Sequence, residues 1–236
     1  MRPVDDTAVV ALGAAVRDGD VEAVHGLLAA DPSLATDRFG DETTSRTALH
    51  LATDWPGRFP RVVETIDALV AAGAPVDGRF VGEHRETPLH WAASTDDVEA
   101  TAALLDAGAD IEADGAVLTG GTPLADAVVF AQWNAARLLV ERGAAMTTWQ
   151  AAALGEIDAL SDLADAADAQ EITNACWHAC RAGQLAAVDM LVDRGADLDW
   201  LGHDELTSRQ AGLASGNDDL VAWLRNAASG SAPRPG

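Results

Sequence analysis

Side chains that can bind a metal ion gather in one short segment, Cys176-Trp-His-Ala-Cys180. Zinc in proteins needs about four cysteine, histidine or carboxylate ligands that converge on one point. The two cysteines are four residues apart in one predicted helix, at places that its buried leucine and alanine residues would take. His178 points away from both. We therefore expect core packing at this segment, without a metal site and without a disulfide framework.

Two further histidines, His50 and His90, occupy the same place in two similar hexapeptides. Imidazole titrates near neutrality, so each is a candidate for proton transfer. A fixed place in a repeated motif favours a structural role over a catalytic one for both. Phosphate chemistry has less support, because a phosphate-binding loop with its lysine is absent and the sequence contains no lysine at all. We expect no cofactor.

The elements that would position these side chains follow from an internal repeat. Thr47-Ala-Leu-His-Leu-Ala52, Thr87-Pro-Leu-His-Trp-Ala92 and Thr122-Pro-Leu-Ala-Asp-Ala127 share one frame. A Gly-Ala pair closes each unit. Its glycines, Gly73, Gly108, Gly143 and Gly195, are separated by 35, 35 and 52 residues. A period in this range predicts a stack of helix pairs in which each unit packs only on its neighbours.

These residues resemble the ankyrin-repeat family, whose signature T-P-L-H-x-A opens the first helix of a repeat of about 33 residues. The match is close over Thr87–Asp110. The resemblance implies an all-α solenoid of about seven helix-turn-helix units with short hairpin-like turns and degenerate end caps. We expect a single domain over residues 1–226 and a disordered tail over residues 227–236, which are small and contain proline.

The resemblance also assigns positions to the side chains. It implies that His50 and His90 are structural, with hydrogen bonds within and between repeats. The residue after the signature histidine faces the concave surface in the family, so successive repeats form a row. Alignment of the inner helices gives Leu51, Trp91, Asp126, Gln150 and His178 in this row, and one turn further on Trp55, Phe130 and Arg181, among others.

This row is either a hydrated polar ladder or a ligand groove. In a groove, Trp55, Trp91 and Phe130 would be the walls, and Asp126, Gln150 and His178 would orient the ligand. The turn that carries His84 would lie at the rim. Because packed helices lie about 8–10 Å apart, Asp126 and His178 would be roughly 16–20 Å apart, too far for a catalytic triad. An acid and a base on opposite sides of a substrate stay conceivable.

The charge of the chain limits its partners. Acidic residues number 38 and basic residues 15, all arginine, which gives a formal charge of −23. Such a field repels nucleic acid and anionic membranes and attracts cationic ligands or basic proteins. The start of the sequence lacks the pattern of a signal peptide and no apolar stretch has the length to span a bilayer. We expect a cytoplasmic monomer.

Two functions follow from the sequence. The first, from the resemblance, is a binding module that docks a protein partner in the concave groove. The second is a small-molecule enzyme of the lyase, isomerase or hydrolase type. Its pocket would lie around Trp91, Asp126, Gln150 and His178, with Asp126 and His178 as the catalytic pair. The sequence leaves open whether the chain is an enzyme.

Overall fold

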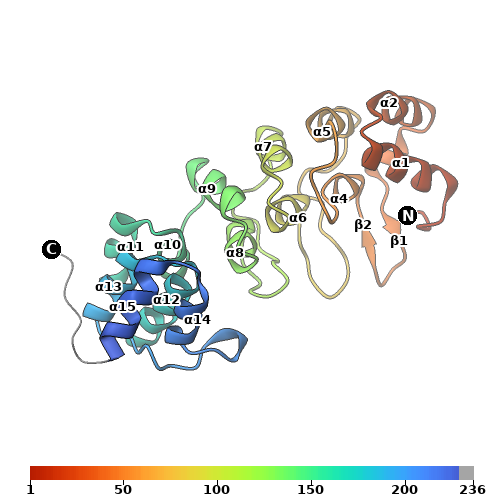
Figure 1. Cartoon of the computed structure of the whole chain (residues 1–236). Coiled ribbons are helices and arrows are strands. Elements are labelled where there is room, and N and C mark those ends of the chain that lie inside the picture. Colours follow the sequence, from red (N-terminus) through yellow and green to blue (C-terminus); the bar gives the residue numbers. More distant parts are fainter. Residues whose placement is uncertain (229–236) are drawn as a thin grey trace. The chain divides into compact units, whose positions relative to one another are not determined.

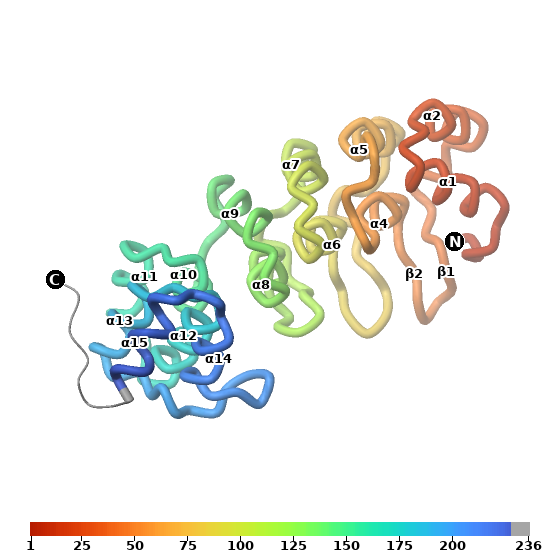
Figure 2. The backbone as a smooth tube through the Cα atoms, viewed as in Figure 1, coloured from red at the N-terminus to blue at the C-terminus, as the bar shows by residue number. Residues whose placement is uncertain are grey.

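The computed structural model describes residues 1–228, and these form two compact units, residues 1–145 and residues 146–228. Seven helix pairs make up the described chain, as the repeat predicts: four in the first unit and three in the second. Figures 1 and 2 show these pairs in order along the sequence.

Unit 1 contains four helix pairs and one small sheet. The first helices of successive pairs contact one another, and so do the second helices, which gives two parallel rows (Figure 1). The segments that join one pair to the next project from the same side of this unit (Figure 2). Its elements are α1 (Thr7–Asp18), α2 (Val21–Ala30), α3 (Ser33–Thr36), β1 (Phe39–Gly40), β2 (Ser45–Arg46), α4 (Ala48–Ala52), α5 (Val62–Ala71), α6 (Pro88–Ser94), α7 (Val98–Asp106), α8 (Pro123–Val129) and α9 (Trp133–Glu141).

Unit 2 contains the remaining three pairs. Helix α12 contacts both α10 and α14, so the first helices are again neighbours. Its elements are α10 (Thr148–Leu154), α11 (Ile157–Ala164), α12 (Ala169–Arg181), α13 (Leu185–Asp193), the 3-10 turn η1 (His203–Glu205), α14 (Ser208–Ala214) and α15 (Asp218–Ala228). Helix α15 therefore includes the first two residues of the predicted tail, and the rest of that tail lies outside the described residues.

The signature residues begin each first helix as expected from their chemistry. Thr87 is the N-cap of α6, Pro88 occupies its first turn, and the His90 side chain completes a capping box with Thr87. Proline loses no hydrogen bond at this place, because the first amide groups of a helix have no partner within it. Gly108 follows the end of α7 with a φ of 89°, a conformation that favours glycine.

The interior of both units consists of leucine and alanine from the inner faces of the helices. In unit 1 the leucines at positions 49, 89, 104 and 124 are fully buried. In unit 2, Cys176 and Cys180 lie in the hydrophobic core together with Trp177. The pKa of the Cys180 thiol is raised by a hydrogen bond with Cys176 and by burial, so this thiol stays protonated.

Candidate functional site

The signature histidines connect neighbouring repeats, as the resemblance implies. Nδ1 of His50 accepts a hydrogen bond from the Thr47 amide at 3.2 Å, and its Nε2 lies 3.2 Å from the backbone oxygen of Glu86. His90 makes the same two contacts, with Thr87 at 3.1 Å and with the Gly121 oxygen at 3.2 Å. A carbonyl oxygen only accepts hydrogen bonds, so both imidazoles are neutral with the proton on Nε2. Burial lowers the pKa of His50 to about 3.

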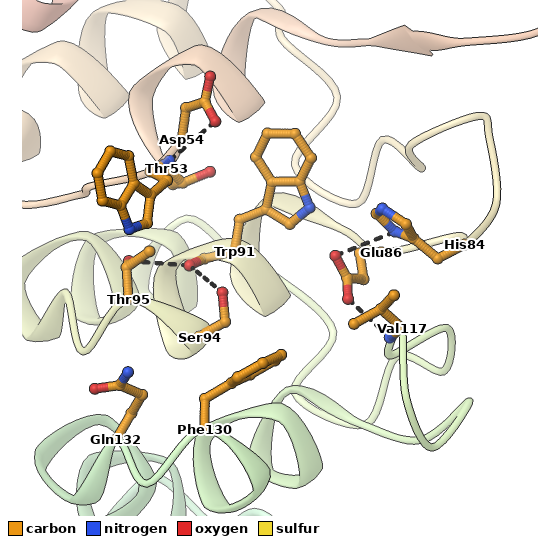
Figure 3. A pocket seen from close by; sticks show the side chains of 11 residues that line it. Thr53, Asp54, His84, Glu86, Trp91, Ser94, Thr95, Val117, Phe130 and Gln132 are labelled. Carbon is orange, nitrogen blue, oxygen red and sulfur yellow. Dashed lines mark hydrogen bonds and ion pairs between the residues drawn. The ribbon is translucent and has the colours of Figure 1, made fainter.

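A groove of about 450 Å³ opens in unit 1. It is lined by residues at the C-terminal ends of α4, α6 and α8 and by residues of the turns that precede α6 and α8. Four of the predicted ligand-binding residues line it: Trp55, His84, Trp91 and Phe130. Figure 3 shows Trp91 and Phe130 between two groups of side chains, with His84, Glu86 and Val117 on one side and Thr53, Thr95 and Gln132 on the other. Asp54 and Ser94 complete the lining.

The aromatic walls of the groove differ in how much solvent they reach. Trp55 is 82% exposed and Phe130 40% exposed. Trp91 is half-buried and packs edge-on against the His50 ring, with the ring centres 4.7 Å apart. The inner wall is thus fixed by packing, and the outer wall presents apolar surface to solvent.

The loop that carries Trp55, residues 53–61, is held by hydrogen bonds and an ion pair to the next repeat. The backbone amide of Arg58 donates to Asp97 at 2.5 Å, and its guanidinium contacts Asp96 at 3.0 Å. Asp96 is itself buried and accepts two further hydrogen bonds, from the Asn134 side chain at 2.8 Å and from the Ala135 amide at 2.9 Å. The Asp96 carboxylate, in the turn between α6 and α7, therefore connects the Trp55 loop to the start of α9.

Glu86 is the acidic residue of the groove that sequence reasoning missed. Its Oε1 accepts a hydrogen bond from the Val117 amide at 2.8 Å, and its Oε2 lies 3.1 Å from Nδ1 of His84. Nδ1 of His84 is close enough for an ion pair with Glu86 but does not form a hydrogen bond with a described residue. The His84 ring is stacked on Phe80, with the ring centres 4.4 Å apart. The one sequence signal for Glu86 is its position directly before Thr87, the N-cap of α6, because this fixes Glu86 at the start of an inner helix.

Asp126 lies beneath this surface. It has no exposed area, and neither of its carboxyl oxygens receives a hydrogen bond from a described residue. The pKa of Asp126 is raised to about 8, first by burial and then by the charge of Glu86 and a hydrogen bond with it. Because Asp126 reaches no solvent, it cannot contact a ligand in the groove directly. This burial does not favour the role of a catalytic residue that touches substrate, which the sequence suggested for it, and that role stays a prediction.

Comparison with known proteins identifies the repeats. Residues 61–148 match the family described as ankyrin repeats (3 copies). The ankyrin repeat domain of human ASB11, a solved structure, is similar in fold, with a TM-score of 0.55 and 18% sequence identity over 90% of this chain and 96% of that chain. Residues 61–148 are thus ankyrin repeats, and the chain has the fold of an ankyrin repeat domain. Among curated proteins, none matches it by sequence.

Gln150 takes the place of the signature histidine and not the place after it. The Gln150 side-chain oxygen accepts hydrogen bonds from the Thr147 amide at 2.8 Å and the Thr147 hydroxyl at 2.9 Å, the capping pattern of His50 and His90. Its carbonyl is thus occupied within α10, and the row predicted from the sequence is displaced by one residue here. Thr147 is the N-cap of α10 as Thr87 is of α6, and both helices have seven residues, so Gln150 and His90 take the same place.

His178 lies in unit 2, within a cluster of aromatic rings. Its ring centre is 4.6 Å from that of Trp149 and 5.1 Å from those of Trp177 and His203. Burial lowers its pKa to about 3, so the ring is neutral near pH 7 and is a weak base. This result argues against the proton-transfer role predicted for it. Arg181 lies at the last turn of the same helix, α12.

Proposed function

We propose that the chain is a protein-interaction module and that the groove of unit 1 docks a basic segment of a partner protein. Ankyrin repeats generally serve as protein–protein interaction modules, which gives the general class of function. The groove supplies the particular surface, and the charge of the chain supplies the kind of partner.

The observation that carries this proposal is the exposure of Trp55 and Phe130 at a groove that is also lined by the carboxylates of Asp54 and Glu86. Tryptophan at 82% exposure is unusual in a folded chain, and aromatic side chains are enriched where proteins bind one another. Such residues contribute much of the binding free energy when a partner covers them. The loop that carries Trp55 is held by Arg58, so this exposure belongs to an ordered surface.

The sign of the charge favours a basic partner. The formal charge of −23 attracts cations over a distance of about 8 Å at physiological salt, and Glu86 and Asp54 lie in the groove itself. Asp54 is neutralised by Arg46 at 2.6 Å, which leaves Glu86 as the acid that a basic residue would meet.

The enzyme alternative depends on Asp126 and His178. Asp126 is fully buried in unit 1, and His178 is a weak base in unit 2. Neither feature favours proton transfer to a ligand, so the interaction function is the one that the geometry supports.

A fluorescent peptide of alternating arginine and leucine tests the proposal by fluorescence anisotropy, next to a peptide with glutamate in place of arginine. We expect only the basic peptide to bind, and we expect Trp55→Ala and Phe130→Ala to weaken its binding by about 5- to 30-fold, the effect of losing 1–2 kcal/mol. Val63→Ala is the matched control, because Val63 is an exposed apolar residue outside the groove lining. Unchanged affinity in both groove variants would refute the docking site.

Location and assembly are proposed on sequence grounds only. No helix within residues 1–228 has both the length and the apolar character needed to cross a bilayer. We keep the cytoplasmic location and the monomeric state as proposals, and sedimentation of the purified chain tests the second.

A further inference from the structure

The protonation of Asp126 follows from its surroundings. An ionised carboxylate that is buried without hydrogen-bond donors is strongly destabilised, because it loses its hydration and gains nothing in return. Both oxygens of Asp126 are in this position within the described part of the chain. The neutral acid avoids this penalty, since its hydroxyl group can donate a hydrogen bond to the neighbouring carboxylate of Glu86. The raised pKa of Asp126 agrees with this arrangement.

Glu86 is the member of the pair that carries the charge, and it is held in place from several directions. The Val117 amide donates to its side chain at 2.8 Å. Its backbone oxygen accepts from the Phe80 amide at 2.7 Å and from His50 at 3.2 Å. With Asp126 behind it and most of its side chain buried, Glu86 has little freedom to move. A carboxylate offers about four acceptor positions, so these contacts leave capacity for a donor from the groove.

The two aromatic rings near Glu86 suit a flat cation. Trp91 and Phe130 line the same groove as Glu86. In Figure 3 both rings lie between the Gln132 side chain and the Glu86 side chain. A guanidinium group stacks on aromatic faces and donates hydrogen bonds in its own plane to a carboxylate. The neighbouring arginines that the structure pairs with acids, Arg46 with Asp54 and Arg79 with Asp114, are directed to other partners.

We infer that Glu86 recognises a single arginine side chain of the docked partner, whose guanidinium group lies against Trp91 and Phe130, and that neutral Asp126 is the positioning residue behind it. This inference depends on the proposed function, because the arginine belongs to the basic segment that the groove docks. Asp126 acts through Glu86 and contacts no ligand. His84, close to the other oxygen of Glu86, lies at the edge of this site.

The test uses N-acetyl-arginine methylamide as the probe and the corresponding citrulline compound as its control, which has nearly the same shape and no charge. Binding is followed by NMR through the carbon-13 signal of the Glu86 carboxylate and the indole N–H signal of Trp91. We expect the arginine probe to shift both signals and the citrulline probe to shift neither. The lysine analogue should bind more weakly, because an ammonium group cannot stack as a guanidinium does.

Variants of the pair separate recognition from positioning. Glu86→Gln should weaken binding of the arginine probe by about tenfold or more, as expected for loss of a charge-assisted hydrogen bond. Asp126→Ala should also weaken it, whereas Asp126→Asn should restore it to within about twofold, since an amide N–H donates to Glu86 in place of the carboxyl proton. Glu83→Gln is the matched control, because Glu83 is exposed in the same turn and does not line the groove.

Each outcome decides between the inference and the proposed function. If the citrulline probe binds as well as the arginine probe, or if Glu86→Gln binds normally, the inference is wrong. If the arginine–leucine peptide nevertheless requires Trp55 and Phe130, docking in the groove stands without it. If the arginine probe binds at Glu86 and the peptide ignores the groove, the inference stands and the docking function fails. Should Glu86→Gln not fold, the comparison of arginine with citrulline still decides, because it leaves the protein unchanged.

Discussion

Nε2 of His50 donates a hydrogen bond to the backbone oxygen of Glu86, 3.2 Å away. A helix of one repeat therefore holds in place the acidic groove residue that belongs to the next repeat. This residue pair joins the structural role of the signature histidine to the candidate site. Because the imidazole must stay neutral to keep both of its hydrogen bonds, the contact is sensitive to acid.

The first prediction concerns the acid stability of His50. Its pKa is about 3 in the folded chain and near 6.5 when unfolded, so the unfolded chain takes up a proton first as the pH falls. The stabilisation is fully present above about pH 6.5 and is lost towards pH 3. His50→Gln keeps the cap on Thr47 and loses the bond to Glu86, so we expect it to be less stable by about 1 kcal/mol at pH 7 and to lose less stability towards pH 4. Urea unfolding at several pH values measures both effects, and parallel pH profiles for the two proteins would contradict the prediction.

The second prediction concerns Asp126, whose effect has the opposite sign. Its pKa is raised from 3.8 to about 8, so between these values the folded chain keeps a proton that the unfolded chain has released. Its contribution to stability therefore falls as pH rises through this range, by up to roughly 1.4 kcal/mol per pH unit. Asp126→Asn removes the dependence, and we expect its stability relative to the parent chain to increase from pH 5 to pH 8. Denaturant unfolding measures this difference; a constant difference would show that Asp126 is not protonated in the folded chain.

The third prediction concerns Asp96, which binds three groups at once. Asp96→Ala leaves the amide of Ala135 and the side chain of Asn134 without their acceptor, and it keeps a positive φ that alanine disfavours. We expect a loss of about 2–3 kcal/mol in the free energy of unfolding, measured by thermal or urea unfolding. Asp96→Asn is the control, since its side-chain oxygen can still accept from Ala135. A loss for alanine no larger than that for asparagine would rule out the proposed role.

The fourth prediction tests the register of α10. If Gln150 fills the place of the signature histidine, Gln150→His should change the stability by no more than about 0.5 kcal/mol, because imidazole Nδ1 can accept from Thr147 in the same way. Gln150→Leu lacks an acceptor and should cost about 1 kcal/mol, as for the loss of a helix cap. Calorimetry of the two variants gives the comparison. Equal losses would return Gln150 to the row that the sequence predicted.

The helix pairs could be predicted because several repeats carry the same local signals. Thr87 and Pro88 open a helix and Gly108 closes the next one, and each signal acts within a few residues. The aromatic residues of the groove could be predicted from the same repeat alignment. Phe130 lies one helical turn beyond the position in its repeat that Trp91 occupies in the preceding repeat. These positions depend only on the helix period.

The polar part of the site could not be predicted in the same way. Glu86 meets Asp126 across 40 positions of sequence, and whether the two carboxyl groups touch depends on the tilt of consecutive repeats. The place of Gln150 was wrong for a different reason. The segment Thr147-Thr-Trp-Gln150 lacks the proline and histidine of the signature, so the sequence allows two alignments, and only the cap on Thr147 distinguishes them. Burial of Asp126 beneath the groove is likewise a property of the packed helices and not of the motif.

The fastening of the Trp55 loop by Arg58 also bears on the thermodynamics and kinetics of association. A loop without such contacts would have to be immobilised when a partner arrives, and the lost conformational entropy would be subtracted from the binding free energy. Here that ordering is completed during folding, through the hydrogen bonds from Arg58 to Asp96 and Asp97. The receptor side of the complex is thus preorganised, and the entropic penalty of binding falls mainly on the incoming segment.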